Sequence, residues 1–208
     1  GHAHREALDA LVAELRAGGH SAEAVTFDVT DAVACRAALE PLAAAAPIQV
    51  LVNNAGHHHD VPMAGMSTAQ WRDVVDVNLN GFFNVTQPLL LPMIATRWGR
   101  IVSVSSIAGV IGNRGQANYA AAKAGLHGAT RSLALEVASR GVTANVVAPG
   151  VVQTARSADA FPPERVKALV PMQRAGLPEE VAALVAFLAS ERAGYITGQV
   201  IAISGGLG

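Results

Sequence analysis

The strongest constraint on the fold is a repeated alternation between short apolar runs and segments with helical periodicity. Strands are expected at residues 23–29, 48–52, 100–105, 142–148 and 199–203. Helices are expected at residues 5–17, 31–45, 68–78, 82–97, 117–139 and 178–190. Strands that alternate with helices form βαβ units, so the strands run parallel and helices cover both faces. The pattern therefore predicts an α/β fold with a doubly wound, Rossmann-like parallel sheet.

Composition favours one packed domain over residues 1–208. Hydrophobic residues make up 51% and charged residues 15%, a balance that excludes a disordered chain. The single cysteine, Cys35, excludes an internal disulfide and a thiolate metal cluster. A net charge of −1 without a basic run gives no reason to expect a nucleic-acid partner. No apolar stretch is long enough for a membrane span, and residues 1–17 do not resemble a signal peptide. A cytoplasmic location is the default expectation.

The segment from Tyr119 to Lys123 is the first candidate for chemistry. Residues four apart on a helix share a face, one turn apart. A Lys ammonium beside a phenol favours the phenolate and lowers its pKa, so that Tyr119 becomes a proton donor to a carbonyl oxygen. The alternative is an ordinary amphipathic helix in which this spacing arises by chance.

Ser106 strengthens the first reading because it follows directly after the expected strand at 100–105. Side chains after the carboxyl ends of parallel strands line the binding crevice. A hydroxyl there would hold a substrate carbonyl in line with Tyr119. Ser103 and Ser105 are comparators, of which one or both are expected to serve local packing alone.

Two Asn-containing segments complete the set of candidates. Asn53-Asn54-Ala55-Gly56 follows a strand, where small residues let a ligand approach the backbone, although a plain turn is the alternative. Asn78 lies where one helix passes into the next. A helix interrupted there exposes a backbone carbonyl to a water chain, whereas a helix C-cap is the competing interpretation.

Taken together, five motifs resemble the short-chain dehydrogenase/reductase family. They are LVNNAG, VNLNGFF, the spacing from SVSS to YAAAK, NVVAPG and ITGQVIAISGG, in that order along the chain. The stretch from GNRGQANYAAAK to NVVAPG most resembles the 3-oxoacyl-acyl-carrier-protein reductases of that family. The resemblance implies reduction of a 3-oxoacyl thioester, carried by acyl-carrier protein, by hydride transfer from NADPH, with NADH as a possible substitute.

The resemblance also implies roles for individual residues. The catalytic set would be Asn78, Ser106, Tyr119 and Lys123, with Tyr119 as general acid and Asn78 as the holder of a water that links Lys123 to solvent. Lys123 would also bind the cofactor ribose. The remaining cofactor contacts would be Asp28 and Val29 at the adenine, Asn54, Ala55 and Gly56 along the adenosine, and Pro149, Gly150, Val152 and Thr154 at the nicotinamide and a phosphate. No metal ligand is implied.

The sequence departs from the family pattern at its beginning. The 208 residues contain no Gly-rich TGxxxGxG turn, and the strand–helix–strand unit that carries it is absent. His2, His4 and Arg5 lie where the second strand of the family would end. Cationic groups there favour a 2′-phosphate, and therefore NADPH over NADH.

A second departure is the run His57-His58-His59-Asp60. Imidazoles beside a carboxylate suit zinc, copper or nickel. However, adjacent histidines do not converge on one ion without a strained backbone, so an influence on substrate entry or on pH response is the preferred hypothesis.

Residues 151–177 are expected to be irregular with one short helix, at the position of the family's substrate lid. Phe161 and Met172 would supply apolar contacts. Arg156, Arg165 and Arg174 either meet an acidic carrier protein or remain solvated.

The sequence is compatible with three functions. They are reduction of 3-oxoacyl thioesters, oxidation or reduction of another secondary alcohol or ketone, and a non-catalytic role as a subunit or regulator. Helices 82–97 and 117–139 carry apolar and small residues where solvent-facing helices usually carry charge, which favours oligomerisation. The family resemblance implies that these helices pair, in a homotetramer or homodimer.

Overall fold

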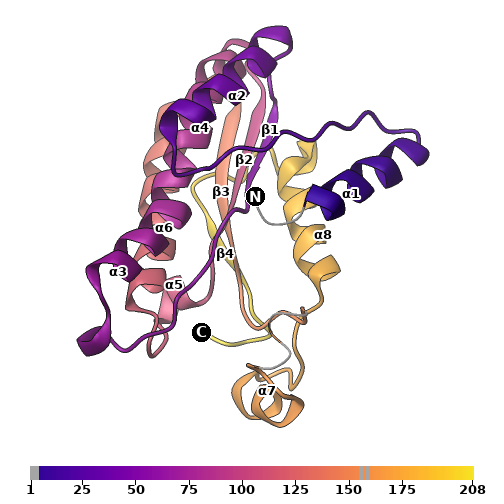
Figure 1. Cartoon of the computed structure of the whole chain (residues 1–208). Coiled ribbons are helices and arrows are strands. Elements are labelled where there is room, and N and C mark those ends of the chain that lie inside the picture. The colour runs from indigo at the N-terminus through magenta and orange to yellow at the C-terminus, as the bar shows by residue number, and fades with distance from the viewer. Residues whose placement is uncertain (1–4, 155–156, 158–159) are drawn as a thin grey trace.

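The computed structural model describes residues 5–154, 157 and 160–208. Its centre is a parallel sheet of four strands in the order β1-β2-β3-β4. The strands are β1 (Val50–Asn53), β2 (Gly99–Val104), β3 (Val142–Pro149) and β4 (Val200–Ile203). Figure 1 shows helices on both sides of this sheet, which confirms the predicted α/β class.

The helices are α1 (Arg5–Ala17), α2 (Ala32–Ala45), α3 (Thr68–Val75), α4 (Gly81–Ala95), α5 (Ala108–Ile111), α6 (Ala117–Val137), α7 (Pro163–Leu169) and α8 (Pro178–Ala189). They match the predicted segments, except that α5 was not predicted and α3 ends at Val75, before the predicted residue 78. Short 3-10 turns occur at Met63–Gly65, Ala138–Arg140 and Glu191–Ala193. Asp31 caps α2 as predicted, because its carboxylate accepts the backbone N–H groups of Val33 and Ala34. Among the described helices, none combines the length and the apolarity that crossing a membrane requires.

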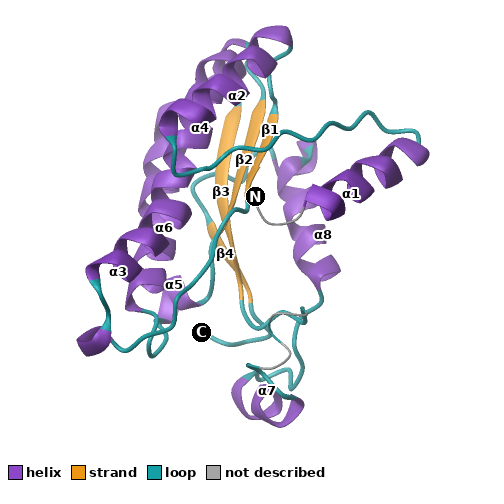
Figure 2. Cartoon of the chain, viewed as in Figure 1, coloured by secondary structure: helices purple, strands orange, loops and turns teal. Residues whose placement is uncertain are grey.

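Two apolar layers hold the helices to the sheet. The larger lies under α2, α4 and α6 and contains Leu39, Leu89, Met93, Ile101 and Leu133. The smaller lies under α8, where Val102, Val147 and Leu188 pack together. Ile101 and Val102 are neighbours on β2 and enter opposite layers, since successive strand side chains point to opposite faces. Figure 2 shows the sheet enclosed between these helices.

The register of the strands places the candidate chemistry at one edge. Asn53 aligns with Ser103, Val104 with Val147, and Pro149 with Ile203. The chain leaves all four strands in the same direction, toward α3, α5 and α7 (Figure 1). In open parallel sheets the binding crevice lies outside this carboxyl edge.

The expectation of a strand at residues 23–29 is wrong. This segment carries no regular structure. A strand needs a neighbour to complete its hydrogen-bond ladder. Among the described residues, no strand pairs with residues 23–29. Side chains hold it instead. Phe27 packs against the larger apolar layer, and the Asn84 amide donates to the Val29 carbonyl at 2.9 Å.

Candidate active site

Tyr119 and Lys123 lie one turn apart near the beginning of α6, as their spacing predicts. The Lys123 Nζ atom is 5.6 Å from the centre of the Tyr119 ring. The Ser106 side chain also interacts with the Tyr119 phenol and lowers its pKa. The structure therefore brings three members of the predicted catalytic set into one cluster.

Asn118, which the sequence analysis missed, fixes the position of Tyr119. Its side chain is fully buried, and its Oδ1 accepts the Tyr119 backbone N–H at 2.8 Å. Its Nδ2 donates to the carbonyls of His59 (3.4 Å) and Gln70 (3.2 Å). Asn118 thus ties α6 to the loop after β1 and to α3. The only sequence signal was an amide residue directly before Tyr119.

Lys123 is almost completely buried, with 3% of its surface exposed. Its Nζ donates to the Val104 carbonyl at the end of β2, at 2.8 Å. Burial lowers the pKa of Lys123 to about 8, because water no longer solvates the ammonium. The described residues place no carboxylate beside it in an ion pair. Two of its three N–H bonds therefore remain for a ligand or water.

The pKa of Tyr119 departs from the sequence expectation. Burial raises it above its ordinary value, the Ser106 hydrogen bond opposes that rise, and the negative charge of Asp60 adds to it. Lys123 was expected to lower this pKa. The Lys123 amine lies 5.6 Å from the ring centre, and desolvation is the largest influence on the pKa of the phenol.

Asn78 lies in a π-helix, Asp76–Asn80, that joins α3 to α4 without a break. Its Nδ2 donates to the carbonyls of His57 (2.7 Å) and Val74 (2.8 Å). Its Oδ1 is buried and has no hydrogen-bond partner among the described residues. The predicted interruption is therefore present as a π-bulge, a feature frequent at functional sites, and not as a C-cap.

Gly56 lies next to the side chains of both Asn78 and Lys123. A Cβ atom at this position would lie 2.6 Å from Asn78 Oδ1 and 3.2 Å from Lys123 Nζ. Only glycine avoids the first of these clashes. The unpaired oxygen and the buried amine therefore face the same small space, as the expected water link between them requires.

The comparator serines behave differently from Ser106. The Ser105 hydroxyl donates to the Lys123 carbonyl at 3.0 Å and lies 2.8 Å from Nε2 of the buried His127. Ser105 thereby attaches α6 to β2, a local structural role. The Ser103 hydroxyl is buried and has no partner in the described chain.

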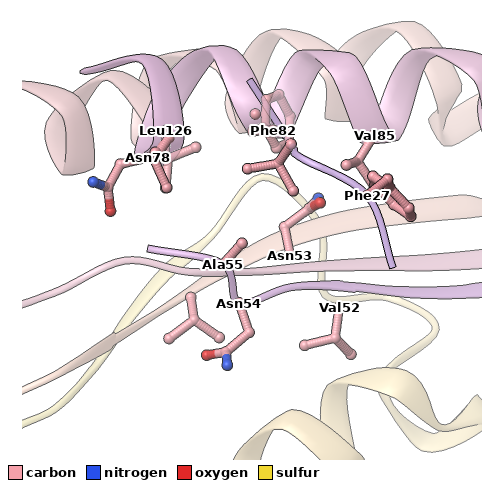
Figure 3. Close-up of a pocket in the computed structure, with 13 residues that line it drawn as sticks. Phe27, Val52, Asn53, Asn54, Ala55, Asn78, Phe82, Val85 and Leu126 are labelled. Atoms are coloured by element: carbon pink, nitrogen blue, oxygen red, sulfur yellow. The ribbon is translucent and has the colours of Figure 1, made fainter. Parts of the chain in front are cut away.

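A cavity of about 160 Å³ lies between β1, α4 and the segment after Phe27, on the side of the site where the adenosine of the cofactor is expected (Figure 3). Val29, Asn54 and Ala55 line it together with Asn78. Figure 3 shows the Asn53 side chain turned toward α4, where its amide donates to Thr86 at 3.1 Å, and Asn54 turned the opposite way. Asp28 is not among the lining residues; its carboxylate accepts the Thr30 N–H and hydroxyl.

The expected nicotinamide loop begins at the end of β3. Gly150 donates its N–H to the Ile203 carbonyl, and a Cβ there would lie 2.8 Å from the Ser204 Cα. Val152 forms a parallel bridge with Gly176. The Thr154 N–H and hydroxyl bond to the Ser157 hydroxyl. Backbone ladders therefore hold the beginning of this loop next to β4.

These residues fit the ribose and nicotinamide half of a dinucleotide. The unsatisfied Asn78 Oδ1, the two remaining N–H bonds of Lys123 and the glycine between them form a polar recess within a buried setting. A buried polar atom without a partner costs free energy, which a bound hydroxyl or water removes.

The three adjacent histidines have three different partners. His57 Nε2 lies 2.6 Å from Asp73 Oδ2, His58 Nδ1 lies 2.8 Å from Asp60 Oδ1, and the Gln70 amide lies 3.3 Å from His59 Nε2. Among the residues that the structure describes, no group of three His, Cys, Asp or Glu is arranged to hold a metal ion.

The lid segment contains α7, as the expected single short helix. Arg174 forms a two-point ion pair with Glu180, at 2.8 and 2.7 Å, and Arg165 lies over the Phe161 ring. Arg174 therefore does not offer a free charge to a carrier protein. Arg156 lies outside the described residues.

Of the three residues on which the predicted preference for NADPH rests, the structure describes only Arg5. His2 and His4 lie outside the described residues. Arg5 lies 3.8 Å from Asp9 on the exposed surface of α1.

Comparisons with known proteins identify the family of the chain. Residues 2–208 match the family described as "Enoyl-(Acyl carrier protein) reductase". The 3-oxoacyl-[acyl-carrier-protein] reductase of Salmonella typhimurium is 42% identical over 91% of this chain and 79% of its own length. The same-named protein of Thermotoga maritima is 43% identical over 100% of this chain and 85% of its own.

A solved structure shows the same fold. The crystal structure of a putative gluconate dehydrogenase from Agrobacterium tumefaciens superimposes with a TM-score of 0.91 at 35% identity. The match covers 96% of this chain and 81% of that one. With the Tyr119–Lys123 pair and Ser106 assembled at the carboxyl edge, these matches show that the chain belongs to the short-chain dehydrogenase/reductase family of NAD(P)-dependent oxidoreductases.

Proposed function

We propose that this enzyme reduces a 3-oxoacyl thioester, presented on acyl-carrier protein, to the 3-hydroxyacyl product with NADPH. The observation that carries the proposal is the cluster of Ser106, Tyr119 and Lys123, in which the half-buried phenol interacts with the Ser106 side chain and its ring centre lies 5.6 Å from the Lys123 amine. Relatives whose names state this activity are 42–43% identical to the chain.

The mechanism follows from what each side chain offers. Ser106 donates a hydrogen bond that holds the substrate carbonyl oxygen beside Tyr119. Tyr119, whose raised pKa keeps its proton at neutral pH, donates that proton to the same oxygen. The nicotinamide, when bound, supplies the hydride to the carbonyl carbon. Lys123 stabilises the phenolate that remains, and a water held at Asn78 returns the proton through Lys123.

The cofactor would be held by the residues that the family resemblance assigns. Lys123 and Tyr119 would hold the ribose. The other contacts would come from Asp28, Val29, Asn54, Ala55, Gly56, Pro149, Gly150, Val152 and Thr154. The preference for NADPH rests on Arg5 and its histidine neighbours, and equal or greater catalytic efficiency with NADH would overturn it.

The deciding assay is oxidation of NADPH with an acetoacetyl thioester, run beside NADH and beside a simple ketone. We expect the thioester with NADPH to be the best pair. Reduction of the simple ketone alone would favour the second candidate, a dehydrogenase of another secondary alcohol. The structural match to a putative gluconate dehydrogenase gives that candidate its support.

We also propose a homotetramer or homodimer built on α4 and α6. Their outer faces expose Phe83 (61%), Leu91 (74%) and Leu135 (86%). Large apolar side chains left exposed on helix faces favour an interface. Light scattering at micromolar concentration tests this, and a fully active monomer would contradict it.

The remaining parts of the proposal concern domain and location. We propose that residues 1–208 act as one short-chain domain, and intact mass of the purified protein shows whether residues precede Gly1. The proposed location is the cytoplasm, where reduced nicotinamide is available.

A further inference from the structure

His58 is the one histidine of the run 57–59 whose ring meets the candidate proton donor. Its ring centre lies 5.8 Å from that of Tyr119, with the two planes at 65°. His57 and His59 have other partners, Asp73 and Gln70. The mechanism above does not use His58, although 42% of its side chain is open to solvent at the rim of the site.

The His58 ring is held in one orientation by a chain of polar contacts. Its Nδ1 lies 2.8 Å from Asp60 Oδ1, and the same oxygen accepts the Gln116 side-chain N–H at 2.8 Å. Asn113 in turn donates to the Gln116 carbonyl oxygen at 2.9 Å. Gln116 is buried, with 9% exposed. The loop before α6 therefore builds the support for an imidazole that belongs to the loop after β1.

A backbone contact joins the same two loops. The Val61 N–H donates to the Gly115 carbonyl at 2.8 Å. Asp60 also contributes to the electrostatics of Tyr119, because its charge is one cause of the raised pKa of that phenol. The pair of His58 and Asp60 is thus part of the surroundings of the reacting hydroxyl.

The contact with Asp60 decides what His58 offers to a ligand. A carboxylate only accepts hydrogen bonds, so the proton of the neutral imidazole is on Nδ1. The other nitrogen, Nε2, then carries a lone pair and acts as an acceptor. Within the described part of the chain, Nε2 has no hydrogen-bond partner.

We propose that His58 contacts substrate and gives this site a second substrate class, ketones that carry a hydroxyl on the carbon next to the carbonyl. The carbonyl oxygen lies between Tyr119 and Ser106, and the neighbouring hydroxyl donates to His58 Nε2. In the reverse direction the same contact selects 1,2-diols. The inference rests on the proposed hydride transfer with Tyr119 as acid, but not on the acyl thioester as substrate.

The chemical step is the reduction already described. The nicotinamide supplies a hydride to the carbonyl carbon, Tyr119 supplies a proton to its oxygen, and the product is a diol. His58 neither gains nor loses a proton in this step. Its contribution is recognition, because a plain ketone offers no hydrogen-bond donor to its lone pair.

The test compares hydroxyacetone with butanone, in which a methyl group replaces the hydroxyl. The measured quantity is the ratio of their kcat/KM values with NADPH, in the wild type and in variants. Differences in intrinsic reactivity between the two ketones cancel when the ratio is compared across variants. We expect His58→Ala to lower the ratio by roughly 3- to 10-fold, the usual worth of one neutral hydrogen bond.

Three further variants sharpen the result. His58→Gln retains an acceptor and should keep part of the preference. Asp60→Asn permits the other tautomer, in which Nε2 carries the proton, and should lower the ratio as His58→Ala does. His59→Ala is the matched control, since its ring bonds to Gln70, and its ratio should equal that of the wild type.

The outcomes separate this inference from the proposed function. A ratio that stays within twofold of the wild type in His58→Ala, with the variant folded by circular dichroism, overturns the role of His58. A lowered ratio in His59→Ala to the same extent overturns it as well. An enzyme that shows the hydroxyacetone preference but does not reduce an acetoacetyl thioester retains this inference and loses the proposed thioester function.

Discussion

The catalytic half of the site and the N-terminal segment of residues 5–29 differ in how the rest of the molecule supports them. Tyr119 and Lys123 lie on α6, which packs against the central strand β3 and has nine buried residues. None of the residues of α1 is buried, and the segment after it forms no ladder. Both regions show helical or strand periodicity in sequence. The helix α1 forms although none of its residues is buried, whereas the predicted strand after it does not form. The difference arises because a helix satisfies its backbone hydrogen bonds within itself, whereas a strand needs a neighbouring strand.

The largest effect is expected from removing the Tyr119 hydroxyl, on which the proposed catalysis depends. Tyr119→Phe keeps the ring and its packing but removes the proton donor. We expect kcat to fall by about 10²–10⁴-fold, the usual contribution of a general acid. The melting temperature should hardly change. A folded variant that keeps activity within about threefold of the wild type would show that Tyr119 is not the acid.

The second prediction sets one leucine of each region against the other. Leu133 on α6 is 8% exposed and belongs to the larger apolar layer, whereas Leu11 on α1 is 49% exposed. Leu133→Ala should lower the free energy of unfolding by about 2–5 kcal/mol. Leu11→Ala should change it by about 0.5 kcal/mol or less. Urea titration of both variants measures the contrast, and equal losses would show that α1 is packed as tightly as α6.

The third prediction uses the buried charge of Lys123. Folding lowers its pKa from 10.5 to about 8, so the unfolded chain binds more protons between those two pH values. Stability therefore rises with pH across this window, by about 3 kcal/mol for this group, and the contribution is absent below about pH 8. Lys123→Met should remove that rise and also abolish activity.

The measurement for Lys123 is the difference in unfolding free energy between wild type and Lys123→Met at pH 8 and at pH 10. Taking the difference removes the contributions of other titrating groups. The Glu179→Gln variant, an exposed change on α8, serves as the control. Because it retains Lys123, its difference from the wild type should be the same at pH 8 and at pH 10. Parallel curves for wild type and Lys123→Met would mean that the Lys123 pKa is not lowered.

The smallest expected effect concerns the two serines at the end of β2. Ser106→Ala removes the hydroxyl proposed to hold the substrate carbonyl beside Tyr119 and should lower kcat on the order of tenfold, with little change in cofactor KM. Ser105→Ala removes the link to the Lys123 carbonyl and should act mainly on stability. If Ser105→Ala lowers kcat more than Ser106→Ala, the assignment of the two residues is reversed.

Much of the fold followed from periodicity and end signals. The strands at 100–105, 142–148 and 199–203 agree with β2, β3 and β4 to within about a residue. β2 and β3 are buried between two layers of helices, as their mainly apolar sequences indicate, whereas β4 is a half-buried strand at the edge of the sheet. The strand predicted at residues 23–29 does not form. Strand formation depends on a neighbouring strand, which the local sequence does not specify.

The sequence by itself determined the class of fold, the parallel direction of the strands and the identity of the candidate acid. These depend on spacing along the chain, and a helix or strand converts spacing directly into a shared face. Tertiary structure decided the electrostatics. The raised pKa of Tyr119, the lowered pKa of Lys123, the unpaired Asn78 oxygen and the contact of His58 with Tyr119 all depend on burial and on loops that meet across the site. Desolvation and contact between distant segments are properties of the packed molecule, and no local pattern encodes them.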